Sequence, residues 1–310
     1  MLILHRLRQA SNKLLSPLGF AVERVEKQPW GRPKLIATRV GNFEILIPST
    51  NPLANLYRRN PGYTSHLGRL AALVKRKYSD FVAMDVGANV GDTACIIESA
   101  GAIPLFCVEG DDFSYSVLEK NLRQFSDARA FKLFLGEKSE AVGVTMAKDG
   151  WNTTLIPDAA GGAKKINLVS LDDFLSPRPE TPRIKLLKID TEGFDCSIIR
   201  GAKKFLRQAQ PVITFEYNRD NMAALGENGL DTLAWLADLG YEPVVFHDCV
   251  GRFFDATTLA DEPFLRNIHE YADGQNAAVY YFDLTVFHHA DRDLAEAFVK
   301  EERARRAGSE

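Results

Sequence analysis

The sequence contains few cysteines, no long apolar run and no excess of basic residues. Cys95, Cys107, Cys196 and Cys249 form no CxxC pair and lie far apart, which predicts reduced, buried thiols and neither disulfides nor a metal site. No stretch approaches the roughly 18 uninterrupted apolar residues of a membrane span. The net charge is -3, from 38 basic and 41 acidic side chains, which argues against a nucleic-acid partner. Together these absences favour a cytoplasmic protein without a transmembrane segment.

The N-terminal residues do not have the composition of a signal peptide. Leucine and isoleucine are interspersed with His5, Arg6, Arg8 and Lys13, which interrupt the apolar core that a signal peptide requires. Residues 2–15 can form a basic amphipathic helix. Two interpretations stay open for it: a helix packed on its own domain, which we favour, or peripheral contact with a membrane surface.

Apolar runs that fit buried strands alternate with helical stretches through most of the chain. The expected strands are 81–86, 104–109, 131–135, 184–190, 212–217, 241–246 and 279–286. The expected helices are 92–100, 113–125, 196–208 and 230–239. This alternation predicts an α/β fold with a mostly parallel, seven-stranded sheet and helices on both faces.

The regions outside this alternation predict three further segments. An appendage is expected over 1–78, with a helix, a hairpin over 34–48 that turns at Gly41 and Asn42, and a lead-in helix over 64–78. The main domain is expected over 79–290. Within it, residues 136–183 are rich in glycine and proline and predict an irregular insertion over the sheet. Residues 291–310 are expected to be a charged C-terminal tail with a fraying helix end.

A glycine-rich stretch follows the first strand of the main domain. Asp85 ends the strand, Gly87, Asn89 and Gly91 follow, and a helix then begins. In this layout, backbone N–H groups meet a ligand at the carboxyl edge of a sheet. No Gly-Lys-Ser/Thr follows, so the stretch is not a P-loop, and Asn89 replaces the middle glycine of a GxGxxG motif. The pattern therefore argues against a ligand that is bound through its phosphate groups.

A second acidic residue is placed to complement this loop. Glu109 ends the next strand, 109 − 85 = 24 residues after Asp85. A carboxylate at that strand end can accept hydrogen bonds from both hydroxyls of a ribose. Two carboxylates beside a glycine loop suit a ligand with a ribose and a positive charge but no phosphate, and S-adenosylmethionine is such a ligand. We expect Asp85 near the methionyl part and Glu109 on the ribose.

Further polar side chains follow the fourth and fifth strands. Asp190 and Glu192 come after one of them, and Glu216 and Asn218 end the next. Such groups can act as a general base, as anchors for a hydroxyl or as ligands of a divalent metal. Each acid, Asp195 included, also fits a helix cap or a surface partner. Asp190 is our first candidate for the base or hydroxyl anchor, and Glu192 is the second.

These segments, in this order, resemble the FkbM family of S-adenosylmethionine-dependent methyltransferases. The resemblance lies in DVGANVGDTA, in residues 109–122 and 168–174, and in KIDTEGFDCSIIRGA followed by ITFEYN. It covers residues 81–218, and KIDTEG before the RGA helix is its most specific part. The chain departs from the family pattern at Gly110, where the family often has proline, and at Phe194 and Asp195.

The resemblance implies a class I methyltransferase fold, which is Rossmann-like, and O-methylation of a hydroxyl on a sugar, glycan or related natural-product metabolite. It implies cofactor contacts at Asp85, Gly87, Asn89, Gly91 and Glu109. In this fold the adenine lies at the end of the third strand, which here places it against Leu135 and Gly136.

Three alternatives stay open. Asp190, Glu216 and Asn218 also resemble the magnesium ligands of metal-dependent small-molecule O-methyltransferases. A nicotinamide-dependent Rossmann oxidoreductase is the second alternative, against which the missing glycine and the lack of a Tyr-x-x-x-Lys motif argue. The third is a catalytically inactive binding protein that retains the methyltransferase fold.

Overall fold

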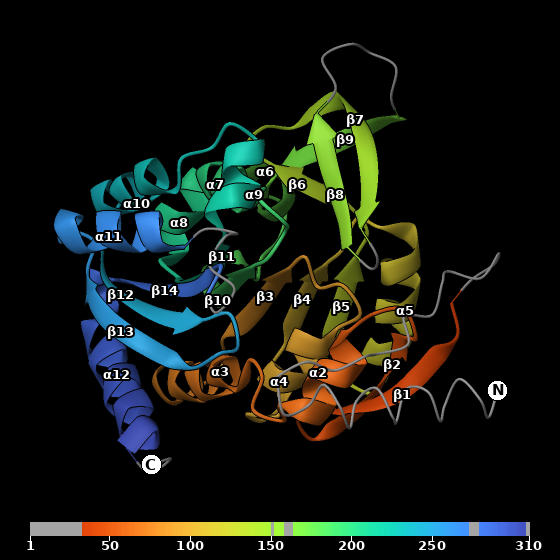
Figure 1. The fold of residues 1–310 in the computed structure, drawn as a ribbon, viewed down its shortest axis with the longest axis horizontal. Coiled ribbons are helices and arrows are strands. Elements are labelled where there is room, and N and C mark those ends of the chain that lie inside the picture. The colour runs from red at the N-terminus through yellow and green to blue at the C-terminus, as the bar shows by residue number, and fades with distance from the viewer. Residues whose placement is uncertain (1–32, 150–151, 158–163, 273–278, 308–310) are drawn as a thin grey trace, which may run out of the picture.

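The computed structural model describes residues 33–149, 152–157, 164–272 and 279–307. Its centre is an eight-stranded sheet (Figure 1). In spatial order the strands are β13 (Phe253–Thr258), β12 (Tyr241–Asp248), β14 (Phe282–His288), β11 (Val212–Tyr217), β10 (Ile184–Ile189), β3 (Val82–Val86), β4 (Leu105–Val108) and β5 (Ala128–Phe131). The pairs from β11 to β5 are parallel, whereas β14 and β13 run antiparallel to their neighbours.

The predicted α/β fold with a mostly parallel sheet is confirmed, but the predicted number of seven strands is wrong. The additional strand is β13, which pairs with β12 at the edge of the sheet. Its sequence is FFDATT, and none of its residues is fully buried. An edge strand that is partly exposed does not need the continuous apolar run by which the buried strands are recognised.

Helices cover both faces of the sheet, as predicted. One face is covered by α3 (Ser65–Lys77), α4 (Asp92–Glu98), α5 (Asp112–Leu122) and α12 (Arg292–Ala307), with α2 (Leu53–Arg59) beside them. The other face is covered by α6 (Leu171–Leu175), α7 (Asp195–Arg200), α8 (Lys203–Ala209), α9 (Arg219–Ala224), α10 (Gly229–Asp238) and α11 (Glu262–Tyr271). Short 3-10 turns occur at Thr181–Arg183 and His289–Asp291. Each face has its own large apolar core.

The single helix expected over 196–208 is in fact two helices, α7 and α8. Gly201 ends α7, and a Cβ there would overlap the backbone of the strand β6 (Phe134–Gly136). The carboxylate of Asp172 then accepts hydrogen bonds from the backbone N–H groups of Lys204 and Phe205, each at 2.9 Å. An acceptor from a distant segment therefore starts the second helix, because it satisfies N–H groups that have no partner within the helix.

The segment expected as an irregular insertion contains a four-stranded sheet. Its order is β6, β9 (Lys164–Ser170), β7 (Glu140–Asp149) and β8 (Asn152–Pro157). Figure 1 shows it above β4 and β5, next to the carboxyl ends of these strands. The strand predicted over 131–135 is divided between the two sheets, because β5 ends at Phe131 and β6 begins at Phe134.

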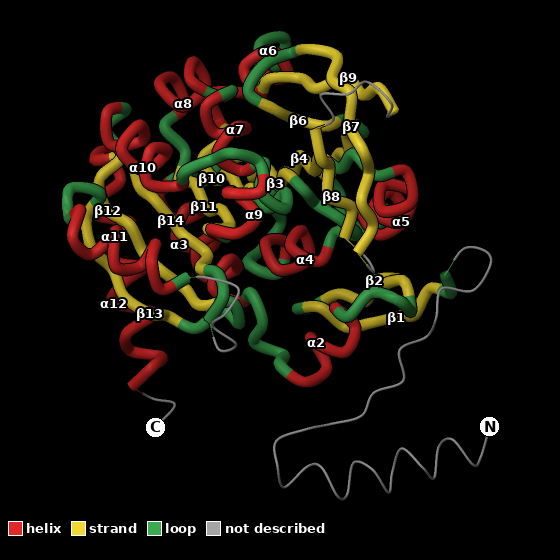
Figure 2. Tube along the Cα trace, turned by 45° about the horizontal axis from the view of Figure 1, so that its top comes forward, coloured by secondary structure: helices red, strands yellow, loops and turns green. Residues whose placement is uncertain are grey.

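The expected hairpin and lead-in helix are both present near the N-terminus. The hairpin consists of β1 (Leu35–Val40) and β2 (Phe43–Pro48), and it lies beside α2 and α5 (Figure 2). Asn121 of α5 accepts from the N–H of Leu46 and donates to the carbonyl oxygens of Leu46 and Val90. One amide therefore joins the hairpin to the glycine-rich loop. The helix predicted over 2–15 lies outside the described residues.

A packed helix occupies most of the segment expected as a charged tail. α12 buries Leu294, Ala295 and Phe298 against the sheet and α3. Glu302, on the same face, binds Arg69 of α3 through two charge-assisted contacts. The apolar positions are few, so composition alone indicates a tail, but their helical spacing aligns them on one face. The predicted domain boundaries themselves stay predictions.

Within the described part of the chain, no helix combines the length and the apolar character that a membrane crossing requires.

The packing of α12 predicts a stability effect. Replacing fully buried Phe298 with alanine removes its contacts with Phe287 and His247 and leaves a cavity. We expect Phe298→Ala to lower the free energy of unfolding by about 3 to 5 kcal/mol, measured by urea denaturation. The exposed neighbour Glu296 is the control, and Glu296→Ala should change stability by less than about 0.5 kcal/mol. Equal stability of the two variants would show that α12 does not belong to the core.

Candidate active site

A cavity of about 590 Å³ lies at the carboxyl ends of the central strands. Along the chain, β3, β4 and β5 are added toward one edge of the sheet, and β10 and β11 are added toward the other. The strand order therefore reverses between β3 and β10. In open α/β sheets, ligands bind in the crevice outside the carboxyl ends of the strands at such a reversal.

The structure brings most of the predicted site residues together at this cavity. Those that line it are Gly87, Asn89, Glu109, Leu135, Asp190, Glu192, Glu216 and Asn218. Those that do not line it are Asp85, Gly91 and Gly136. The first group comes from five separate segments of the chain, so the predicted juxtaposition of these strand ends is confirmed.

The glycine-rich loop is shaped by the close approach of two strand ends. Gly87 has φ +77°, and a Cβ there would overlap the carbonyl group of Asp190. Glycine at this position is therefore a steric requirement of the fold, beyond any contact with a ligand. Asn89 follows with φ +45°. Gly91 has φ +89° and precedes α4, where a Cβ would lie 3.0 Å from Leu118.

Glu109 connects the glycine loop to the end of β4. Its carboxylate accepts hydrogen bonds from the backbone N–H of Asn89 at 2.8 Å and from that of Asp111 at 2.7 Å. Burial raises the pKa of Glu109 to about 7, although these N–H groups oppose the rise. A carboxylate has about four lone-pair sites. Two N–H donors therefore leave acceptor capacity that faces the cavity.

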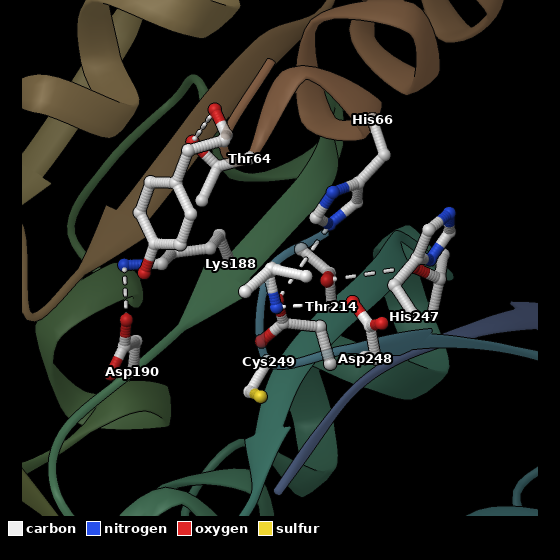
Figure 3. Close-up of polar contacts among 12 residues, drawn as sticks. Thr64, His66, Lys188, Asp190, Thr214, His247, Asp248 and Cys249 are labelled. Carbon is white, nitrogen blue, oxygen red and sulfur yellow. Dashed lines mark hydrogen bonds and ion pairs between the residues drawn. The ribbon is translucent and has the colours of Figure 1, made fainter. Parts of the chain in front are cut away.

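Asp85 is not placed as expected. It is fully buried in β3, behind the cavity wall, and its carboxylate lies 3.2 Å from the ammonium of Lys188. Lys188 also lies 3.3 Å from Asp190, whose side chain is 42% exposed, and Figure 3 shows this contact. Burial disfavours the charge on Lys188, but Asp190 and Asp85 outweigh it and raise the pKa of the ammonium. Asp85 therefore does not contact a ligand in the cavity but helps to hold the Lys188 ammonium beside Asp190.

Polar side chains continue this row across the sheet. Lys188 pairs in register with Asp85 on one side and with Thr214 on the other, and Thr214 pairs with Thr285. Because strand side chains alternate between faces, these four lie on the same face. That face is covered by α3, and Leu67 in its first turn lines the cavity. Sequence analysis did not identify Lys188, although a charge within a buried run is itself a signal.

Four carboxylates gather on the far side of the cavity from Glu109: Asp190, Glu192, Glu216 and Asp283. Burial, and then the charges of Asp190 and Glu192, raise the pKa of Glu216 well above its usual range. Burial and Asp190 raise the pKa of Asp283 to about 8. Asp283 was also missed, because β14 was recognised only as an apolar run.

The magnesium alternative has no support in this arrangement. Across the described residues, no three histidine, cysteine, aspartate or glutamate side chains converge closely enough to hold one metal ion. The side chain of Asn218 instead accepts a hydrogen bond from the N–H of Asn221 at 3.2 Å and caps α9.

The loop after β10 is held by its own acids. Glu192 adopts φ +55° and accepts a hydrogen bond from the amide of Asn221 at 3.1 Å. Asp195 is buried, and one of its oxygens accepts from the N–H groups of Thr191 and Gly193 and from the hydroxyl of Thr191. Asp195 therefore shapes the loop, and it neither lines the cavity nor caps α7.

The N-terminal region supplies one wall of the cavity, which sequence analysis did not predict. Tyr63 and Thr64 line it, directly before α3. Tyr57 of α2 donates a hydrogen bond to Asp92 at 2.8 Å, and Asp92 also lines the cavity. The region interpreted as an appendage therefore completes the site.

Comparison with known proteins identifies the family. Residues 85–243, just over half of the chain, match the family described as "Methyltransferase FkbM domain". The chain belongs to the FkbM methyltransferase family. The predictions of a methyltransferase and of S-adenosylmethionine as its cofactor are confirmed by this membership. No curated protein matches the chain.

Solved structures that match the chain include two methyltransferases and TYW2. Methyltransferase FkbM from Methylobacillus flagellatus KT is 16% identical with a TM-score of 0.42, and the match covers 58% of this chain but only 43% of that one. TYW2 from P. horikoshii in complex with MeSAdo is 12% identical with a TM-score of 0.43, covering 91% and 83% of the two chains. Precorrin-6y C5,15-methyltransferase from Geobacter metallireducens GS-15 is 13% identical with a TM-score of 0.36, covering 70% and 86%.

The contact at Gly87 predicts a sharp difference between two glycines. Gly87→Ala places a Cβ against the Asp190 carbonyl at a positive φ, so we expect a loss of more than about 2 kcal/mol in unfolding free energy. At Gly62 the nearest atoms to a new Cβ are 3.6 and 3.8 Å away, so Gly62→Ala should leave stability unchanged or slightly raised. Thermal and urea unfolding of both variants measures this. A Gly87→Ala protein as stable as Gly62→Ala contradicts the predicted close approach.

Proposed function

We propose that this FkbM-family methyltransferase transfers the methyl group of S-adenosylmethionine to a hydroxyl of a sugar, glycan or related natural-product metabolite. The observation that carries the proposal is one cavity that joins the Gly87 loop and Glu109 to the carboxylate of Asp190. The proposed acceptor is a small molecule or a glycan. A cytoplasmic location of the protein and the absence of a nucleic-acid partner stay predictions.

The residues present fit the cofactor. Glu109 offers its remaining acceptor sites to the ribose hydroxyls. Leu135 and the neighbouring Phe134 supply an apolar wall for the adenine. Gly87 and Asn89 line the cavity at the glycine-rich loop, where the methionyl part is proposed to bind. Three residues act indirectly in this proposal: Gly91 through the shape of the loop, Gly136 through the close packing of β6 against Leu168, and Asp85 through Lys188.

When bound, S-adenosylmethionine would supply a sulfonium methyl group, which an acceptor oxygen attacks in line while S-adenosylhomocysteine leaves with the electrons of the S–CH3 bond. The protein must then align the two reactants and accept the proton of the hydroxyl. Asp190 is the proposed acceptor of that proton, because its carboxylate reaches the cavity while Lys188 holds it in place. Glu192, two residues further on, is the second candidate.

The raised pKa of Glu109 predicts how cofactor binding depends on pH. Its carboxyl group becomes ionised as the pH rises through about 7, and the ionised form accepts hydrogen bonds from ribose more strongly. We expect the affinity for S-adenosylhomocysteine, measured by calorimetry, to increase from pH 6 to pH 8. Glu109→Ala should weaken binding by about 1.5 to 3 kcal/mol and abolish the increase. The exposed Glu119→Gln variant should keep both, and an increase that survives in Glu109→Ala would refute the ribose contact.

The role of Asp190 predicts a separation of binding from turnover. We expect Asp190→Asn to lower methyl transfer by about 10²- to 10⁴-fold, because the proton acceptor is lost. Its affinity for S-adenosylhomocysteine should change little. Transfer is measured as release of S-adenosylhomocysteine and as methylated product, over a panel of sugars, amino sugars and polyhydroxylated natural products. If Glu192→Gln abolishes transfer and Asp190→Asn does not, the role passes to Glu192.

The same measurements separate this proposal from its rivals. Binding of S-adenosylhomocysteine without transfer to any panel member would favour a catalytically inactive binding protein. Tight binding of NADH alone would favour the oxidoreductase and overturn the proposal.

A further inference from the structure

Two acidic residues of the cavity lie directly opposite each other on neighbouring strands. Glu216 of β11 and Asp283 of β14 are register partners in an antiparallel pair, and both line the cavity. Partners of this kind have Cβ atoms about 4.5 to 5.5 Å apart on the same face, and like charges there are destabilising. Burial and the charge of Asp190 raise both pKa values, so the two groups are ionised together only when a positive charge lies beside them.

Among the described residues, no lysine or arginine forms an ion pair with Glu216 or Asp283, although the charge of Lys188 acts on Asp283 from further away. Lys188 is the one basic side chain among the described residues that line the cavity, and it already contacts Asp85 and Asp190. His66 lies 3.9 Å from Asp283, but burial lowers its pKa well below the usual range, so it is neutral. Its ring stacks on His247, as Figure 3 shows, and that ring is also buried. The pair is therefore left with a neutral neighbour.

The proposed cofactor does not supply the charge either. Its methionyl group carries a carboxylate beside the ammonium, so one sulfonium charge remains, and Asp190 lies between Glu109 and the acidic pair to face it. A single metal ion is also a poor fit, since no three acidic, histidine or cysteine side chains of the described residues converge on one point. Carboxylates that are spread around a chamber match a larger, organic cation better.

Aromatic side chains complete the chamber. Tyr63, Tyr280 and Tyr281 line the cavity beside the acidic pair. Tyr281 donates a hydrogen bond to the carbonyl oxygen of Cys249 at 3.2 Å, which holds its ring in place. Tyrosine rings attract organic cations, and carboxylates bind both ammonium groups and hydroxyls. These are the side chains expected around a molecule that carries an amine among its hydroxyls.

We propose that the acceptor carries a protonated amine near the hydroxyl to be methylated, as in an amino sugar or an aminocyclitol, and that Glu216 and Asp283 bind its ammonium group. This inference rests on the proposed function, since it names the acceptor class of the same site. It also implies exclusion of anionic acceptors, because the carboxylates repel phosphorylated and carboxylated sugars.

The first experiment compares matched ligands in the presence of saturating S-adenosylhomocysteine. Calorimetry or ligand-observed NMR measures binding of glucosamine, N-acetylglucosamine, glucose and glucuronate, and of an aminocyclitol with its N-acetylated form. We expect each amine to bind at least about tenfold more tightly than its N-acetylated partner, and glucuronate to bind least.

The second experiment removes the charges without changing the shape. The double variant Glu216→Gln, Asp283→Asn should bind the amines and the N-acetylated partners equally. The exposed acid Asp238 of α10 provides the control, and Asp238→Asn should keep the preference. The ligand-free double variant should melt close to the wild type, which shows that it is folded, because its amides replace carboxyl groups whose raised pKa values favour the neutral form when no cation is bound.

The outcomes separate this inference from the proposed function. If S-adenosylhomocysteine does not bind, the proposed function fails. If it binds but the amines bind no better than their N-acetylated partners, or do not bind at all, only the present inference is overturned. Binding of the neutral sugars that requires magnesium would also overturn it, in favour of a metal. An amine preference that persists in the double variant would show that other groups bind the ammonium.

Discussion

The contact between the glycine loop after β3 and the end of β10 is the constraint on which the rest of the site depends. A Cβ at Gly87 would overlap the backbone of Asp190, so the two strand ends can meet only without a side chain there. Lys188 reinforces the contact by binding Asp85 on one strand and Asp190 on the other. One steric fit and one shared ammonium thus place the loop proposed for the cofactor beside the carboxylate proposed for the acceptor.

The two sides of the cavity differ in how their charges are compensated. Glu109 is satisfied by backbone N–H groups of Asn89 and Asp111, which orient it and leave acceptor capacity. Among the described residues, no backbone N–H donates to the carboxyl group of Glu216 or Asp283, and burial together with the charge of Asp190 raises both pKa values, which favours the protonated forms. This asymmetry matches the proposed division of the cavity: the side with Glu109 binds the cofactor with fixed geometry, and the side with Glu216 and Asp283 binds a cationic acceptor.

The N-terminal region contributes to this division as part of the enzyme. Tyr57 binds Asp92 at the start of α4, and Tyr63 covers the acidic side of the cavity. Asn121 ties the hairpin to the glycine loop through the carbonyl oxygen of Val90. At the other end of the chain, α12 packs through Phe298 and binds α3 through Glu302. The N-terminal region therefore braces α4 and the glycine loop, and the C-terminal helix braces α3.

The sequence by itself determined the α/β class, the strand ends that carry Glu109, Asp190 and Glu216, and the family, because these depend on local periodicity and on contiguous motifs. It did not reveal β13, since a half-exposed edge strand needs no apolar run. Only the tertiary structure decided that Asp85 is buried behind Lys188 and that Asp283 faces Glu216. Register across strands that are 67 residues apart (283 − 216 = 67) is set by packing of the whole sheet, which leaves no signal in either strand alone.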